Sequence, residues 1–117
     1  MSSATAQSLP PSSSQSVNGK TVYRSTHLAG IINDSGSDII YNVEISMFDS
    51  LGNTKSNSLV GQIAPGSGSQ STAVGPLFLD LDASLYNSGD SVTFTCETHV
   101  TGGVSAADYQ TNHLVIT

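Results

Sequence analysis

The segment IIYNVEISMF, residues 39–48, constrains the fold of this chain more than any other stretch. Val43, Ile45 and Met47 alternate with polar residues along it. A period of two residues is typical of a β-strand that has one face in a core and the other in water. The segment therefore predicts a well-formed strand of an antiparallel sheet.

Short β-rich runs recur after residue 20, and clusters of Gly, Pro, Asn, Asp and Ser separate them. The expected strands lie within residues 21–32, 39–48, 54–63, 70–79, 91–100 and 109–117. No amphipathic helix of useful length interrupts them, and residues 80–90, the least regular part, leave room for one helical turn. We therefore predict an all-β protein, an immunoglobulin-like antiparallel β-sandwich of about seven strands.

Two of these segments allow a more specific prediction about side-chain orientation or position in a sheet. In residues 91–100, the apolar residues Val92, Phe94, Cys96 and Val100 share the face that is expected to point inward. In residues 70–79, Pro76 lacks a backbone N–H, which restricts this strand to a sheet edge or a bend.

Residues 1–19 have a different composition from the rest of the chain. They are rich in Ser, contain Pro10 and Pro11, and end at Asn18-Gly19. Such a segment buries too little apolar surface to offset the entropy lost on ordering. We expect a flexible tail or linker over 1–19, able to tether the protein, and one β-sandwich domain over 20–117. The tail has neither the basic region nor the apolar core of an intact signal peptide.

The charge of the chain limits its partners. The net charge is −6, and the only basic side chains are Lys20, Arg24 and Lys55. Binding to a polyanion requires several cations to displace counterions, so we expect no nucleic-acid partner. Apolar runs such as residues 77–79 are far too short to cross a bilayer, so we expect no direct membrane insertion.

Neutral polar residues replace the missing charges. Charged residues make up 10% of the chain, against about 25% in ordinary soluble proteins. Serine and threonine fill the gap. This composition indicates an extracellular or cell-envelope location, with a virion surface as the alternative. Cys96 is the only cysteine, so no intrachain disulfide can form.

Asp80, Asp82 and Asp90 form the candidate metal site. If a strand continues through Leu81, the carboxylates of Asp80 and Asp82 lie on one face, and Asp90 returns near them. Carboxylate oxygens suit a hard cation such as Ca²⁺, and we expect no other cofactor. The alternative is that Leu77, Leu79 and Leu81 fill the core and the aspartates simply face solvent.

Two other patterns invite a metal interpretation. Asp49 and Asn53 flank Gly52 in an oxygen-rich turn, which supplies fewer ligands than calcium needs and equally suits a hairpin closed by Asp49. Cys96 and His99 have the spacing of a copper loop, with His27 or His113 as a further imidazole. Alternation places Cys96 and His99 on opposite faces, and the expected methionine position holds Val104, so a buried core cysteine is the alternative.

No catalytic set emerges. The chain lacks a G-x-S-x-G elbow, and its GSGS segment precedes a strand where a phosphate cradle needs a helix. We therefore expect a protein that is not an enzyme.

The stretch 28–66 resembles the FxLYD-type domains, small immunoglobulin-like β-sandwiches of bacterial and archaeal envelope proteins. The matching elements are Gly30, the NDSGSD turn, YNVEISMFD, Gly52 and IAPG at 63–66. The motif that names the family falls on residues 45–49, where only Asp49 is identical. The resemblance implies the fold and lends no defined chemistry.

These observations favour a non-catalytic structural or adhesive module of a cell or virion surface, which contacts proteins or its own copies through sheet edges. The alternative is a module that binds a glycan or Ca²⁺ through loops at one end of the sandwich, drawn from residues 33–38, 80–90 and 101–108.

Overall fold

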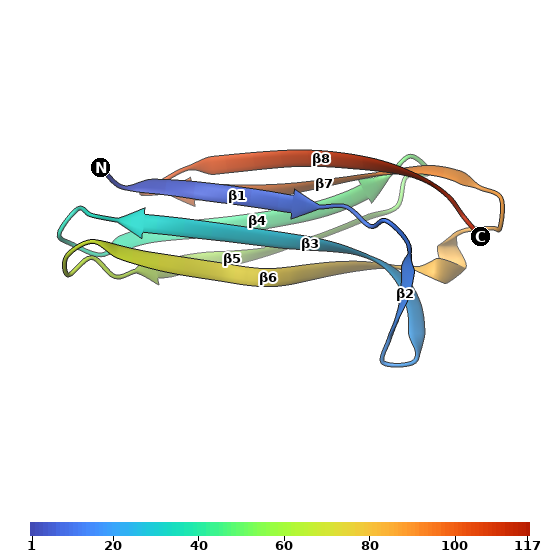
Figure 1. Cartoon of the computed structure of the whole chain (residues 1–117), viewed down its shortest axis with the longest axis horizontal. Coiled ribbons are helices and arrows are strands. Elements are labelled where there is room, and N and C mark those ends of the chain that lie inside the picture. Colours follow the sequence, from blue (N-terminus) through green and yellow to red (C-terminus); the bar gives the residue numbers. More distant parts are fainter.

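The computed structural model describes residues 1–117 as two antiparallel β-sheets packed face to face (Figure 1). The elements are β1 (Ser3–Leu9), β2 (Ser14–Val17), β3 (Lys20–Asn33), β4 (Ile39–Asp49), β5 (Thr54–Ala64), β6 (Gln70–Asp82), the short 3-10 helix η1 (Ala83–Leu85), β7 (Ser91–Gly102) and β8 (Ala106–Val115). The predicted β-sandwich is confirmed, with eight strands where about seven were expected, and η1 provides the helical turn. No helix has the length and apolarity that a membrane crossing requires.

The two sheets differ in strand order. One sheet has the order β5-β4-β7-β8. In the other, β3 is central: β6 pairs with one side of β3, while β1 and β2 pair in succession with its other side. The molecule measures 54 × 25 × 18 Å. Along one long side β1 runs beside β8, and along the other β5 runs beside β6 (Figure 1).

The core follows from the alternation in the sequence. Successive side chains of a strand point to opposite faces, so each strand gives one row to the interior. The rows include Tyr41, Val43, Ile45 and Met47 from β4, Leu79 and Leu81 from β6, and Val92, Phe94, Cys96 and Val100 from β7. All of these residues are buried, as the sequence predicts for β4 and β7.

Three aromatic rings fill one end of this core. Tyr23 of β3 stacks on Phe94 of β7 with ring centroids 5.3 Å apart. Tyr86, which follows η1, meets the Tyr23 ring edge-on at 5.2 Å. Aromatic contacts of this geometry stabilise beyond the area that they bury, so the cluster holds the two sheets and the η1 corner together.

The structure corrects the expected flexible tail. Residues 3–9 form β1 and pair continuously with β3, from Ser3 opposite Ile32 to Leu9 opposite Thr26. The ladder satisfies the β1 backbone, and its inward side chains, Ala4, Ala6 and Ser8, are too small to mark a strand by hydrophobicity. The sandwich therefore includes β1, and the expected flexible segment over residues 1–19 is wrong for residues 3–9.

The Asn18-Gly19 pair also belongs to the fold. It joins β2 to β3 as a two-residue hairpin, with φ values of 50° and 81°. Positive φ at both central residues is the geometry that Asn-Gly turns favour between antiparallel strands. The other expectation for this sheet is confirmed, because β6, which contains Pro76, is an edge strand.

Candidate functional site

Asp80, the first predicted calcium ligand, is occupied by an ion pair. The Arg24 guanidinium donates to it twice, Nε to Oδ1 at 2.8 Å and Nη2 to Oδ2 at 3.0 Å. Arg24 and Asp80 lie opposite each other on β3 and β6. Leu79 and Leu81, on either side of Asp80, are buried. The leucines thus fill the core while the aspartate lies on the outer face, as the alternative interpretation predicts.

The other two predicted ligands stabilise the chain locally. Asp82 Oδ1 accepts a hydrogen bond from Ser84 N at 2.9 Å and caps η1. Asp90 Oδ2 accepts from Asn87 N at 2.9 Å and closes the next turn. No group of three or more His, Cys, Asp or Glu side chains is arranged to hold a metal ion. The structure therefore does not bring Asp80, Asp82 and Asp90 together as a calcium site.

Asp49 closes the β4–β5 hairpin. Its Oδ1 accepts hydrogen bonds from Leu51 N and Asn53 N, both at 2.9 Å, and its Oδ2 accepts from Asn53 Nδ2 at 2.8 Å. Gly52 has φ of 95°, a conformation that side chains disfavour. The turn interpretation of these residues is confirmed.

Asp49 has a second partner that could not be inferred from the sequence. Tyr86 donates its hydroxyl to Asp49 Oδ2 at 2.6 Å, and both residues are buried. Burial opposes ionisation of Asp49, but hydrogen bonds from Tyr86, Asn53 and Leu51 outweigh it and hold the pKa of Asp49 below its ordinary value. Burial first, and the Asp49 carboxylate second, raise the pKa of Tyr86, which keeps its phenol protonated as a donor.

A second polar cluster lies buried where β1, β3 and β7 meet. We call Ser8, Ser25, His27 and Thr98 the buried polar cluster. Thr98 Oγ1 lies 2.7 Å from Ser8 Oγ and 2.9 Å from His27 Nδ1, and it donates to the Gln7 carbonyl at 3.0 Å. His27 Nε2 lies 2.8 Å from Ser25 Oγ. Thr98 therefore connects β7 to both β1 and β3.

The Thr98 hydroxyl and the burial of His27 together assign the protons of this cluster. Because Thr98 gives its only proton to Gln7, it accepts from His27 Nδ1–H and from Ser8. Burial favours the neutral imidazole, in which His27 Nε2 accepts from the Ser25 hydroxyl. Burial lowers the pKa of His27, and the nearby Glu97 carbonyl offsets this only in part.

The buried polar cluster resembles a catalytic dyad in composition, but its position supports a structural role. His27, Ser25 and Thr98 have no exposed surface. A nucleophile must reach its substrate, and these hydroxyls face only other protein groups. The cluster satisfies its own buried donors and acceptors, which is the condition for a polar core that stabilises.

The copper ligands also lie apart. Cys96 is fully buried, and burial raises the pKa of its thiol to about 12. His99 lies on the opposite face of β7, where its Nε2 is 3.0 Å from Glu97 Oε1. Cys96 is thus a core residue, as the alternative predicts.

The sequence contained a signal for the buried polar cluster that apolar periodicity did not capture. Thr98 has the same parity as Phe94 and Cys96, so it occupies an inward position in an apolar row. Ser25 and His27 likewise alternate with outward residues beside Tyr23. Polar residues at inward positions of two strands predict a buried hydrogen-bonded contact. The inward position of Ser8 could not be predicted in this way, because no large apolar residues alternate in the segment around it.

A cleft of about 850 Å³ opens at the end of the sandwich that carries η1. The β2–β3 hairpin, the β4–β5 turn and the end of β6 line it, and they contribute Lys20, Lys55, Asp80 and Asp82. Neither lysine forms a salt bridge. Hydrogen bonds from Ser84, with a smaller contribution from the Lys20 charge, hold the pKa of Asp82 below its usual range. Two of the three basic side chains of this acidic chain, Lys20 and Lys55, therefore line the cleft, and the third, Arg24, pairs with Asp80 of its lining.

The three loops considered for ligand recognition do not share one end. Residues 33–38 and 101–108 lie together, since Gly103 N donates to Ile40 O at 3.0 Å. Residues 80–90 lie at the far end, beside the β2–β3 hairpin (Figure 1). This corrects the grouping of these loops into a single binding surface.

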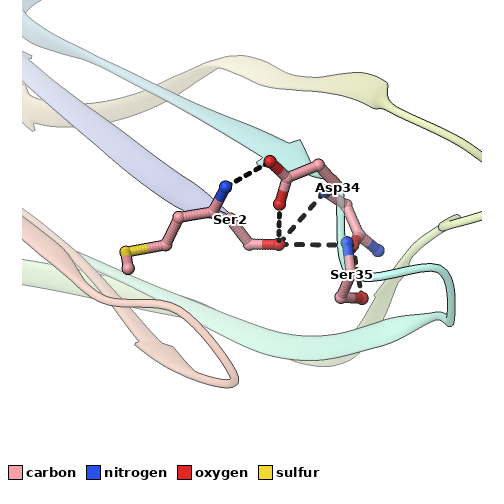
Figure 2. A network of polar contacts seen from close by, with 5 residues as sticks. Ser2, Asp34 and Ser35 are labelled. Atoms are coloured by element: carbon pink, nitrogen blue, oxygen red, sulfur yellow. Dashed lines mark hydrogen bonds and ion pairs between the residues drawn. The ribbon is translucent and has the colours of Figure 1, made fainter.

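The turn at 34–38 is tied to the start of β1. Figure 2 shows Ser2 and Asp34 in this network: Asp34 N donates to Ser2 Oγ at 3.1 Å, and Ser2 Oγ donates to Asp34 Oδ1 at 3.3 Å. The Met1 amine pairs with Asp34 Oδ2 and holds the pKa of Asp34 below its usual range. These contacts anchor the first residues of the chain against the β3–β4 turn.

Comparison with known proteins adds little to this geometry. No protein-family model and no curated protein matches the chain. A structural genomics target of the Northeast Structural Genomics Consortium, SoR45, solved by X-ray crystallography, is similar with a TM-score of 0.41 and 11% sequence identity. The similarity covers 97% of this chain and 86% of that chain. A similarity of this size carries no argument about function.

Removing the Tyr86 hydroxyl tests the contact with Asp49. We expect Tyr86→Phe to lower the free energy of unfolding by about 1.5–3 kcal/mol, because the lost hydrogen bond is buried and its acceptor is charged. Urea denaturation followed by circular dichroism measures the change. Tyr109→Phe, at an exposed tyrosine, serves as the control and is expected to have little effect. Equal losses in the two variants would contradict the assigned role of Tyr86.

The buried neutral His27 predicts a dependence of stability on pH. Its folded-state pKa lies below the ordinary 6.5, so between these values the folded protein binds fewer protons than the unfolded chain. The contribution of His27 to the free energy of unfolding is therefore complete above about pH 6.5, and it decreases as the pH drops below that value.

Denaturation of the wild-type protein and two variants at a series of pH values between about 7 and 5 checks this sign. We expect His27→Gln to flatten the slope, while His113→Gln, at an exposed histidine, keeps it. Stability that rises toward pH 5 in the wild-type protein would overturn the assignment of a neutral His27.

Proposed function

We propose that this protein is a non-catalytic structural or adhesive module that contacts other proteins, or its own copies, through a sheet edge. The observation that carries this proposal is that the two long sides of the sandwich differ. Hydrogen bonds of β1 with β7 and β8 close the β1/β8 side, whereas none joins β5 to β6. On the β5 side, Asn33 Nδ2 of β3 donates to the Ala64 carbonyl, at the last residue of β5. An unpaired strand edge presents backbone donors and acceptors to which another chain can add a strand.

Side chains seal the β1/β8 side. Asp108 of β8 accepts from Ser8 N at 2.8 Å, and Thr98 of β7 donates to the Gln7 carbonyl. Asn112 Nδ2 donates to Pro11 O at 3.0 Å. These bonds occupy backbone groups along β1 and its connection to β2, so an incoming strand finds few free partners there.

The β5/β6 side is open. No hydrogen bond joins residues 54–64 to residues 70–82. β5 pairs with β4 without interruption from Thr54 to Leu59. The first irregularity of this ladder lies between Leu59 and Gln62, which pair with Val43 and Tyr41. Ser58 N donates to the side chain of Asn57 at 2.9 Å, outside the ladder with β4. β5 therefore offers a straight run of edge-facing backbone.

Apolar side chains lie next to this edge. Ile40 and Ile63 are direct partners on β4 and β5, and both are more than half exposed. Val60 of β5 is 74% exposed. In a surface dominated by Ser and Thr, these three residues supply the apolar area that a protein contact needs.

Composition and topology support the remaining parts of the proposal. The low charge and high Ser and Thr content favour an extracellular or cell-envelope location, or a virion surface. The order of strands, with β3-β6 in one sheet and β5-β4-β7-β8 in the other, favours an immunoglobulin-like sandwich and agrees with the resemblance to FxLYD-type domains. With three basic residues in the chain, nucleic acid is not a proposed partner.

Ligand binding at the cleft is a second candidate, favoured by the unpaired ammonium groups of Lys20 and Lys55. Their charges suit an anionic sugar such as a uronate, with Asn18 and Asn53 available to its hydroxyls. Titration with uronate oligosaccharides, followed by NMR, is expected to shift the amides of the cleft. The shifts should disappear in Lys20→Gln/Lys55→Gln. Shifts that persist in this variant, or an equal response to neutral oligosaccharides, would exclude the site.

A proline on β5 tests the edge contact. Alternate residues of an antiparallel strand point their N–H groups to the same side, so Ser56 faces the open edge as Ser58 does. We expect Ser56→Pro to remove one edge donor at little cost to the fold and to abolish association measured by light scattering at increasing protein concentration.

Ser56→Ala retains the N–H and serves as the matched control, which should associate like the wild-type protein. Melting curves verify that both variants fold. Association that survives Ser56→Pro, or a wild-type chain that stays monomeric at its highest soluble concentration, would contradict self-association through β5.

A further inference from the structure

We propose that β1 is an exchangeable strand, and that residues 3–9 of one copy occupy the position of β1 in a second copy. This inference rests on the proposed function, because it names the partner as another copy of this chain. We call the position of β1 the β1 slot: the edge of β3 from Thr26 to Ile32, together with the side chains of Thr98 and Asp108.

The β1 slot requires an occupant. Without β1, Thr98 loses its acceptor at Gln7 and its partner Ser8, and His27 stays in contact with a Thr98 that lacks these bonds. Polar groups that lose their partners in a protein interior destabilise the fold. An empty slot is therefore unfavourable, whereas a slot filled by any copy of residues 3–9 is fully satisfied.

The contacts of the β1 slot select this particular strand. The inward side chains are small, with Ala4 and Ala6 packed against the core and Ser8 placed to meet Thr98. Ser8 N donates to Asp108 Oδ2 at 2.8 Å, and Ser8 Oγ, whose proton goes to Thr98, lies 3.4 Å from the Asp108 carbonyl. Residues 3–9 supply the small side chains and the inward hydroxyl that these contacts use, so a second copy of this segment fits the slot.

Outside its ladder with β3, β1 and the residue before it are held by side-chain contacts with Thr98, Asp108 and Asp34, all of which lie at the slot and are available to a second copy of the strand. β1 pairs only with β3, and neither β2 nor any other strand shares its ladder. Residues 10–13, between β1 and β2, contain Pro10 and Pro11 and lie outside both strands. Prolines lack the N–H of a ladder and favour an extended backbone of about 3.1 Å per residue, so this connection is a semi-rigid spacer. The bond from Asn112 Nδ2 to the Pro11 carbonyl at 3.0 Å holds it against β8, and the bend that exchange requires falls at residues 12 and 13, which are exposed.

Exchange leaves the contacts inside the slot unchanged. The same residues meet in both arrangements, so the balance depends on the spacer and on protein concentration. The β2–β3 hairpin stays within its own chain and anchors the spacer. The β1/β8 side, which offers few free partners to a foreign strand, thereby becomes a specific interface between two copies.

Two single-cysteine variants detect the exchange in the full chain. Gln7 of β1 and Leu28 of β3 are direct partners. Untagged Gln7→Cys and mass-tagged Leu28→Cys are mixed, unfolded in urea, refolded at high protein concentration, and treated with a short bifunctional thiol reagent. Cys96 is fully buried and does not compete. We expect a cross-chain adduct between the two variants that increases with protein concentration, whether it joins two copies or a longer series.

The controls make either outcome decisive. The double variant Gln7→Cys/Leu28→Cys, treated while dilute, should bridge within one chain and so verifies the folded β1 slot. Gln7→Cys mixed with Ser46→Cys, on the other sheet, sets the level of random bridging. An adduct of Gln7→Cys with Leu28→Cys no greater than this level, in samples where the double variant bridges, would overturn strand exchange.

The same experiment separates this inference from the proposed function. If light scattering shows association that Ser56→Pro abolishes, while no adduct forms in the β1 slot, the edge contact stands and strand exchange falls. If the adduct forms and Ser56→Pro has no effect on association, the copies join through β1 and the β5 contact falls.

Discussion

The architecture of this sandwich depends on one hydroxyl group, that of Thr98. It lies on β7, gives its proton to the backbone of β1, and accepts from His27 on β3. Three strands from both sheets are thereby joined at a point from which water is excluded. Because the bonds are buried, each is worth more in place than it would be at the surface, and each would be costly to lose. The closure of one side of the molecule, and hence the asymmetry between its two sides, follows from this contact.

A second buried polar contact performs the same task at the other end. The Asp49 carboxylate organises the β4–β5 hairpin and holds the Tyr86 hydroxyl, which lies after η1 and before β7. Tyr86 also packs on Tyr23. The corner between β6 and β7 is therefore tied to the hairpin of the opposite sheet. In a chain with few charges, one buried carboxylate with four hydrogen bonds replaces the surface ion pairs that other domains use, which individually contribute little.

The strands with large apolar residues were predictable. Val43, Ile45 and Met47 carry their own alternation, so the burial of β4 could be inferred before any partner was known. The turn chemistry of Asp49 and Gly52 was equally local. β1 was missed because Ala and Ser alternate with Thr and Gln there, and a period of two among small residues gives almost no hydrophobic contrast. The Asn-Gly hairpin signal that follows was present, but its first strand, β2, is short and polar.

Local sequence patterns were enough to establish that the chain is all-β, which residues line the core of β4 and β7, and where the hairpin at Asp49 turns. These properties depend on neighbours within a few residues, and alternation and turn preference express them directly. The roles of Asp80, Asp82 and Asp90, the partner of Asp49, and the place of residues 3–9 became visible only in the folded chain. Each of these depends on a contact between distant segments, such as Ser8 with Thr98, and such a contact exists only when the backbone of β3 brings the two together. Which sides of the sandwich are closed or open, and so how it can meet another chain, is a property of that assembly.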